Sequence, residues 1–218
     1  MARKPTREAA RIAAIFDRFA AATPEPRTEL AYASPFTLLV SVVLSAQATD
    51  VSVNKATAKL YAVANTPPAM AALGEAALIP YIAQIGLFRT KARNVVALSR
   101  KLIEEHGGEV PLDRAALQAL PGVGRKTASV VLNELGVEAA IAVDTHVFRV
   151  AHRLALSRGK TPDQVEADLM HIVPKDRRTR AHHWLILHGR YVCVARAPRC
   201  ATCVVGDLCP SRSLFLGV

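Results

Sequence analysis

The stretch Leu120-Pro121-Gly122-Val123-Gly124-Arg125-Lys126-Thr127-Ala128 is the most informative segment of this sequence. Two glycines flank one apolar residue, and this pattern permits a tight turn with positive φ and the close approach of another backbone. Val123 is expected to point inward and anchor the turn. A helix is expected to begin at about Arg125, so its first N–H groups lack helical partners and attract a phosphate. A glycine-rich connection between packed helices is the alternative, whereas a dinucleotide-binding loop is excluded because no strand pattern precedes the turn.

Residues that start and end helices recur on both sides of this turn. Three pairs have the sequence of an N-cap followed by proline: Ser34-Pro35, Thr66-Pro67 and Thr161-Pro162. Gln164 adds a capping box to the last of them, and Asp113 is placed to cap a short helix. Gly136 is expected to end the helix that begins near Arg125. One short strand-like run, residues 139–143, has no partner, so the sequence predicts an all-α fold.

The composition favours a helical protein with an anionic partner. Hydrophobic residues make up 51% and aromatic residues 5% of the 218 residues, which favours packed helices in one large or two small domains. The net charge of +10 indicates a polyanion such as nucleic acid, with a basic enzyme that has no such partner as the alternative. The most apolar run, residues 36–48, is too short to span a membrane. The first twenty residues have the spacing of an amphipathic helix rather than a signal peptide, so we expect a cytoplasmic protein without a membrane partner.

Lys126 and Asp144 are candidates for chemistry at opposite ends of the helix that follows the turn. The positive end of the helix dipole disfavours a protonated amine near Lys126, and a neutral amine is what Schiff-base chemistry requires. Judged on residue type alone, a solvated lysine and a helix-capping aspartate are the ordinary interpretation.

The cysteines form a second candidate site near the C-terminal end. They are Cys193, Cys200, Cys203 and Cys209, in the spacing C-x6-C-x2-C-x5-C. Their proximity in a protein expected to be cytoplasmic indicates a metal site rather than disulfides. Zinc sites usually pair two short Cys-x-x-Cys segments, and only one is present. Pro210 follows the last cysteine as in some iron–sulfur loops, so the spacing favours an iron–sulfur cluster and leaves zinc open.

Several motifs in the same order resemble the endonuclease III family of helix-hairpin-helix DNA glycosylases. They are residues 120–128, Ala142-Val143-Asp144-Thr145-His146, Leu44-Ser45-Ala46-Gln47-Ala48-Thr49-Asp50, Ile85-Gly86-Leu87-Phe88, residues 183–191 and the four cysteines. The resemblance extends from about residue 29 to residue 210. It implies a six-helix barrel lobe over residues 28–138 and an iron–sulfur helical lobe formed by residues 1–27 and 139–218, with a cleft between the lobes.

The resemblance also implies an activity. The family members are base-excision-repair glycosylases that remove oxidised pyrimidines from damaged double-stranded DNA and have an associated AP lyase activity. On this basis Lys126 is the nucleophile, Asp144 is the catalytic carboxylate, and the four cysteines hold a [4Fe–4S] cluster. A monomer associated with the nucleoid is expected.

The residues expected to bind DNA lie in three turns. They are Gln47, Leu87 and the hairpin residues Gly122, Val123, Gly124 and Arg125. By resemblance, the Gln47 amide replaces the lost pairing of an orphaned base, and Leu87 enters between base pairs. Without the resemblance, ordinary capping for Gln47 and ordinary packing for Leu87 are the simpler interpretations.

Two groups of residues have less specific patterns. Arg89, Lys91 and Arg93 follow Leu87 and either hold phosphates or form a solvated basic face. The histidines at positions 182, 183 and 188 have no carboxylate at ligand spacing, so we expect them to pack and hydrogen-bond rather than to bind a metal.

Two other functions are left open by the sequence. One is a monofunctional mismatch or uracil glycosylase of the same fold, although relatives of that type usually lack a lysine at the position of Lys126. The other is a DNA-binding or redox-sensing protein without catalysis, which would bind a damaged duplex and release no base.

Overall fold

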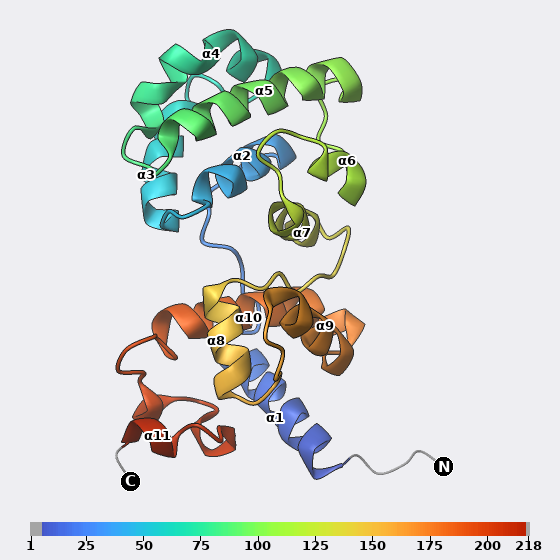
Figure 1. Cartoon of the computed structure of the whole chain (residues 1–218), viewed down its shortest axis with the longest axis vertical. Helices are drawn as coiled ribbons and strands as arrows, with labels where there is room; N and C mark the ends of the chain where they lie inside the picture. The colour runs from blue at the N-terminus through green and yellow to red at the C-terminus, as the bar shows by residue number, and fades with distance from the viewer. Residues whose placement is uncertain (1–5, 217–218) are drawn as a thin grey trace. The chain divides into compact units, whose positions relative to one another are not determined.

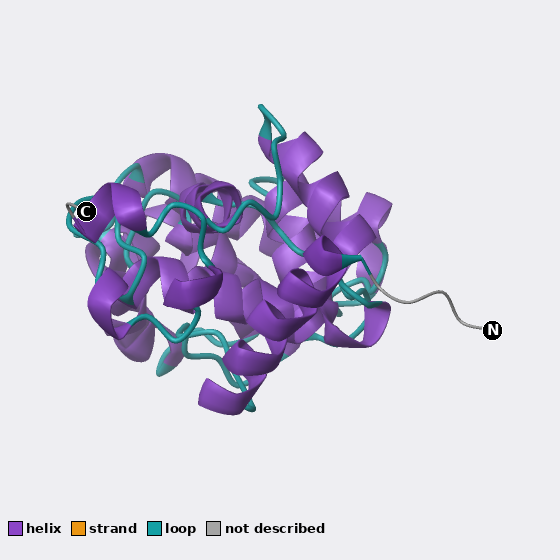
Figure 2. Cartoon of the chain, turned by 90° about the horizontal axis from the view of Figure 1, so that it is seen from below, coloured by secondary structure: helices purple, strands orange, loops and turns teal. Residues whose placement is uncertain are grey.

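A computed structural model describes residues 6–216 of the chain, and every regular element in this range is a helix, as Figure 2 shows by colour. The prediction of an all-α fold is therefore confirmed. The strand-like run at residues 139–143 is extended and largely buried, but it pairs with no strand in the described part of the chain. No helix between residues 6 and 216 combines the length and apolar character that crossing a membrane requires.

The chain divides into two compact units, and the first is continuous in sequence, residues 28–138. Its helices are α2 (Pro35–Ser45), α3 (Asp50–Tyr61), α4 (Pro67–Ile82), α5 (Phe88–His106), α6 (Arg114–Gln118) and α7 (Arg125–Glu134), labelled in Figure 1. Helix α2 packs against α3, α5 and α7, and its residues 36–44 are all buried. A helix that is apolar on every face must be surrounded by other elements, so α2 forms the centre of this unit.

The helices of this unit begin and end at the residues that the sequence indicated. Ser34 Oγ accepts a hydrogen bond from Thr37 N at 3.2 Å, and Thr37 Oγ1 accepts one from Ser34 N at 2.9 Å, so the first turn of α2 is capped reciprocally. Asp113 caps α6 through Ala116 N. Gly136 follows α7 with a φ of +70°.

The second unit combines the described parts of residues 1–27 and 139–218. Its helices are α1 (Arg7–Ala22), α8 (Thr145–Arg153), α9 (Pro162–Ile172), α10 (Arg178–Tyr191) and α11 (Ser213–Leu216), with 3-10 turns η1 (Lys175–Arg177), η2 (Cys200–Thr202) and η3 (Gly206–Leu208). Helix α8 packs against α9 and α10. Helix α1 is fastened to them through Phe16 and Phe19 in the shared core and through Trp184 Nε1, which donates to Thr23 O at 2.7 Å.

The capping box predicted at the start of α9 forms with a different backbone N–H from the one expected. Thr161 Oγ1 accepts from Gln164 N at 3.3 Å, as expected, but Gln164 Oε1 accepts from Lys160 N at 2.7 Å rather than from the N-cap residue itself. The glutamine therefore stabilises the residue before the cap, because the chain enters the helix with the Lys160 N–H turned toward it.

Candidate functional site

The glycine hairpin is packed against helix α5 of the same unit. Val123 N donates to Leu120 O at 3.1 Å, and the Val123 side chain is only 5% exposed, so it anchors the turn as expected. Gly122 has a φ of +78°, and a Cβ placed there would lie 2.9 Å from Asn94 Cβ. The backbone of the hairpin consequently approaches α5 more closely than any residue with a side chain could allow.

Lys126 stands on the first turn of helix α7, directly after this hairpin. The N-cap residue, Gly124, supplies no side-chain hydrogen bond to the helix. Arg125 and Lys126 are both exposed. The start of α7 thus presents backbone N–H donors and two cationic side chains together, which is an arrangement that binds a phosphate.

Asp144 lies in the other unit, where it is the N-cap of helix α8. Its Oδ1 atom accepts from His146 N and from Val147 N, both at 2.8 Å. Asp144 therefore caps α8, and the two hydrogen bonds of the cap fix the orientation of its carboxylate. Both cap bonds use the same carboxylate oxygen, Oδ1.

Gln47 and Leu87 share an uncommon backbone conformation. Their φ angles are +55° and +59°, in the left-handed region that residues with a side chain rarely adopt. Leu87 is 60% exposed, so ordinary packing does not explain it. Gln47 is also exposed, and the N-cap of the following helix is Thr49, so ordinary capping does not explain it either. Strained and exposed residues of this kind are concentrated at functional sites.

Lys91 neither holds phosphates nor belongs to a solvated basic face, so both interpretations of the sequence are wrong for this residue. It is 5% exposed, and its Nζ atom donates to Leu44 O at 2.9 Å and to Ala46 O at 2.6 Å. Burial lowers the pKa of its ammonium group. Its neighbours Arg89 and Arg93 are exposed, as expected. The sequence held a signal for this burial, because Lys91 shares the helical face of Val95 and Leu98.

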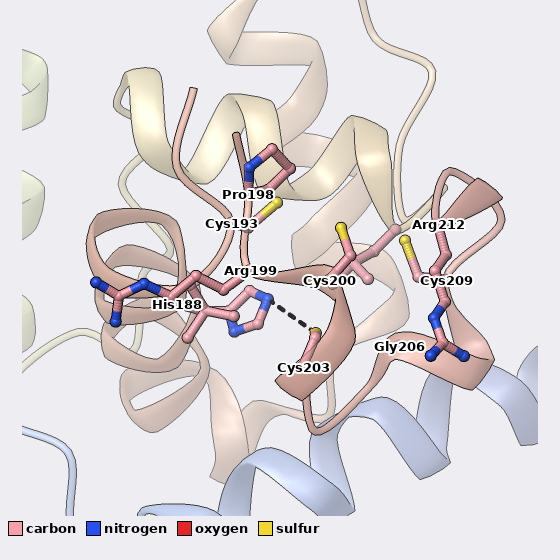
Figure 3. A pocket seen from close by; sticks show the side chains of 11 residues that line it. His188, Cys193, Pro198, Arg199, Cys200, Cys203, Gly206, Cys209 and Arg212 are labelled. Atoms are coloured by element: carbon pink, nitrogen blue, oxygen red, sulfur yellow. Dashed lines mark hydrogen bonds between the residues drawn. The ribbon is translucent and has the colours of Figure 1, made fainter. Parts of the chain in front are cut away.

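The four cysteines line one pocket of the second unit, together with His188 and Arg212 (Figure 3). The pocket is a small hollow of about 20 Å³ that is partly open to solvent. All four thiols are free and partly exposed. In residues 6–216, no three Cys, His, Asp or Glu side chains converge on a point where one metal ion could be held.

Two of the four thiols, those of Cys203 and Cys209, make polar contacts around the pocket. The dashed line in Figure 3 joins Cys203 Sγ to His188 Nε2, which are 3.7 Å apart. The Cys209 thiol donates to Arg153 O at 3.3 Å. Burial raises the pKa of both thiols. Thiols without carboxylates are ligands that suit soft metals and iron–sulfur clusters, so the chemistry of these side chains is compatible with the cluster that the family implies.

Arg153 contacts the start of the cysteine segment, a role that the sequence did not indicate. Its Nη1 atom lies 3.5 Å from Cys193 Sγ and donates to Val194 O at 2.8 Å, and its Nη2 atom donates to Ala195 O at 3.0 Å. Its guanidinium thus holds the start of the cysteine segment in place. The sequence offered only its position in the last turn of a helix, which is common for arginine.

The buried histidines pack as expected. His182 and His183 contact each other edge to face, and His188 lies against Phe19 with ring centroids 4.9 Å apart. Burial lowers the pKa of His188 to about 4, so its ring is neutral at physiological pH.

Known proteins match both the sequence and the structure. Residues 40–175 match the model of the HhH-GPD superfamily of base excision DNA repair proteins. Endonuclease III of Escherichia coli K12 is 58% identical over 195 residues, which cover 89% of this chain and 92% of the relative. Endonuclease III of Treponema pallidum is 56% identical over 201 residues, which cover 92% of this chain and 95% of the relative.

Solved structures agree with this assignment. A trapped endonuclease III–DNA covalent intermediate, in an estranged-adenine complex, has a TM-score of 0.90 and 43% identity, covering 95% of this chain and 98% of its own. A non-covalent endonuclease III–DNA complex has a TM-score of 0.91 and 43% identity, covering 96% and 99%. A thermostable thymine-DNA glycosylase has the same fold at 22% identity and a TM-score of 0.79. This chain therefore belongs to the endonuclease III family of base excision repair enzymes, which are bifunctional DNA glycosylases and AP lyases with the all-α HhH-GPD fold.

Proposed function

We propose that this enzyme removes oxidised pyrimidines from double-stranded DNA, with Lys126 as the nucleophile and Asp144 as the catalytic carboxylate. The observation that carries the proposal is the exposed amine of Lys126 beside the open N-terminal turn of α7, immediately after the hairpin. A related structure is described as a trapped covalent intermediate of endonuclease III with DNA, which supports a nucleophile on the enzyme that forms a covalent bond to DNA.

The chemistry begins when the damaged nucleotide is turned out of the base stack. The neutral Lys126 amine attacks C1′ of the deoxyribose, and the bond from C1′ to the base breaks with its electron pair going to the base. Proton loss from nitrogen and opening of the sugar ring give an imine. Removal of a proton from C2′ then expels the 3′ phosphate by β-elimination, and water releases Lys126.

Asp144 has two tasks in this scheme. Its carboxylate stabilises the positive charge that develops on the sugar as the base leaves. It also accepts a proton when the lysine amine is activated. Because Oδ1 is held by two N–H groups of α8, the orientation of Oδ2 is determined before substrate arrives.

The partner we propose is a damaged DNA duplex bound by one copy of the chain. The hairpin residues 122–125 hold backbone phosphates through N–H groups and the Arg125 side chain. Leu87 enters the stack, where its apolar side chain separates base pairs, and the Gln47 amide bonds to the base that has lost its partner. The exposed, left-handed positions of both residues support these roles.

A [4Fe–4S] cluster held by the four cysteines is the cofactor we propose. When bound, the cluster links four points of residues 193–209 and stabilises a segment that has little regular structure of its own. Purified protein should be brown and contain iron and acid-labile sulfide in about equal amounts, as the composition of such a cluster requires. A colourless protein that contains one zinc ion would refute this cofactor.

The test of the proposed function is a borohydride trapping assay on a panel of duplexes. The panel contains thymine glycol, uracil, an A·G mismatch and an abasic site, and the variants are Lys126→Ala and Asp144→Asn. We expect wild type to release thymine glycol and to form a covalent adduct, and Lys126→Ala to form none. Undiminished trapping in Lys126→Ala would contradict the assignment of the nucleophile.

Asp144→Asn separates catalysis from capping. Asparagine is as good an N-cap as aspartate, so α8 should be as stable as in wild type. Base release should nevertheless fall by about a hundredfold or more, because the charge that stabilises the transition state is gone. A variant with normal base release would show that the carboxylate is only a cap.

A further inference from the structure

Lys91 connects the two strained turns that carry Gln47 and Leu87. Its backbone N–H donates to Leu87 O at 3.0 Å, while its side chain reaches the other turn and donates to Ala46 O at 2.6 Å and to Leu44 O at 2.9 Å. The backbones of the two turns also lie close together, since a Cβ placed on Gly86 would lie 3.7 Å from Gln47 O.

We propose that Lys91 is a positioning residue that locks the Gln47 turn to the Leu87 turn, so that both enter the duplex as one rigid element. This inference rests on the DNA-binding roles proposed above for Gln47 and Leu87. It assigns Lys91 no contact with substrate, because its side chain is buried in the protein.

The chemistry of the contact explains why a cation occupies a buried position. Helix α2 ends at Ser45, and the last carbonyl groups of a helix have no helical partner and carry the negative end of its dipole. Ser45 Oγ donates to Val42 O at 2.9 Å, and Lys91 bonds to Leu44 O and Ala46 O. Burial of a charge is unfavourable unless the charged group is hydrogen-bonded, and the carbonyl groups of Leu44 and Ala46 accept the hydrogen bonds that the ammonium group needs.

The contact also explains how the strain at Gln47 persists. A left-handed residue with a side chain is kept in place only when its surroundings determine its conformation. The residue before Gln47 is held through its carbonyl by Lys91, and Ala48 N donates to Ser45 O at 3.0 Å. With the ammonium removed, Ala46 O is free to turn toward water, and Gln47 is free to relax to an ordinary φ.

The test uses Lys91→Met, which keeps the length and apolar packing of the side chain and removes its donors. The matched control is Lys101→Met on the same helix, where the lysine is partly exposed and pairs with Glu105 at 3.6 Å. Two measurements are made with each protein. One is the fluorescence of 2-aminopurine placed opposite the lesion, which reports the separation of the opposite base. The other is the single-turnover rate of base release.

Base release is measured on two duplexes that differ only opposite the lesion. One carries a normal base and the other carries an abasic analogue, which leaves no orphaned base and lowers the cost of opening. We expect Lys91→Met to be slower by roughly tenfold on the first duplex, the loss expected when the charged hydrogen bond to Ala46 O, which holds the Gln47 turn, is removed. It should be nearly normal on the second duplex, and the 2-aminopurine signal should be reduced. Lys101→Met should match wild type in the fluorescence signal and in the rates on both duplexes.

Three other outcomes would decide against part or all of the inference about Lys91. Equal losses on both duplexes would show that Lys91 only stabilises the fold, and would overturn the inference. Lys91→Gln keeps a neutral donor and serves if the methionine variant does not fold, with the same selective loss expected at smaller size. If Gln47→Ala and Leu87→Ala show the selective loss and Lys91→Met does not, the Lys91 inference alone fails. If none of them shows it, the roles proposed for Gln47 and Leu87 fail as well.

Discussion

Replacement of Gly122 by alanine tests whether the hairpin depends on its close approach to helix α5. The matched control is Gly124→Ala, two residues away in the same turn. Gly122 has a φ of +78°, and a Cβ there would lie 2.9 Å from both Asn94 Cβ and Asn94 Nδ2. Gly124 has a φ of −87°, and no atom lies within 4 Å of a Cβ placed there. The two variants thus add the same methyl group to two very different environments.

The size of the effect follows from two terms. A left-handed conformation costs a residue with a side chain roughly 1–2 kcal/mol. Overpacking against an atom that cannot move away costs about 1–3 kcal/mol more, and Asn94 Cβ is such an atom because it is attached directly to the α5 backbone. The free energy of unfolding should therefore fall by about 2–5 kcal/mol in Gly122→Ala and by less than about 0.5 kcal/mol in Gly124→Ala.

Urea unfolding followed by circular dichroism measures both values, and DNA binding at several salt concentrations completes the comparison. Gly122→Ala should bind a lesion duplex more weakly because the hairpin is displaced. Gly124→Ala should keep its stability whatever its effect on DNA binding, since its methyl group would meet no atom of the protein within 4 Å. Equal stability of the two variants would refute the argument that the hairpin is packed against α5.

Three further predictions concern other parts of the molecule. Burial raises the pKa of the Tyr61 phenol, whose hydroxyl donates to Thr37 O at 2.8 Å. The protonated phenol therefore stabilises the folded protein fully below about pH 10, and this stabilisation is lost as the pH rises above that value. Tyr61→Phe should therefore melt below wild type at pH 8, and the gap should close by about pH 11, whereas a constant gap would contradict the shift. Leu87→Gly removes the cost of a left-handed backbone at a residue with a side chain, so the melting temperature of the variant should rise by an amount corresponding to about 1 kcal/mol, while the rate of base release falls. A fall in both the melting temperature and the rate would show that Leu87 is needed for folding. Iron chelation should expose residues 193–209 to protease and leave residues 28–138 protected, and uniform digestion would count against a local role for the cluster.

The features that sequence alone predicted are those with local causes. Ser34 and Asp113 cap their helices because a short polar side chain at the start of a helix satisfies N–H groups two or three residues away. Gly136 ends α7 for a similarly local reason, since it takes a positive φ at little cost. The hairpin belongs to this class as well, because its pattern lies within nine consecutive residues. Family resemblance then provided the candidate residues, and their individual roles stay predictions.

The features that sequence alone could not predict depend on partners distant along the chain. Lys91 is buried because the end of α2, more than forty residues earlier, needs donors for its carbonyls. Arg153 is similarly committed to carbonyls of residues 194 and 195. Residue type suggested an exposed cation in both cases. The left-handed φ angles of Gln47 and Leu87 are equally invisible in sequence, because neither is a glycine and neither precedes a recognisable turn motif.

The placement of α1 has a consequence for the order in which the protein is made. Phe16 and Phe19 share a core with residues between 141 and 205, whereas the core of residues 28–138 is built from one continuous stretch. At roughly 5–20 residues per second, a ribosome needs about 10–40 s to add the partners of α1 after α1 has emerged. During this interval the continuous unit can fold while the apolar stripe of α1 has no core to enter. Helix α1 is thus synthesised before the continuous unit but packed after it, and its apolar face stays without its core during this interval.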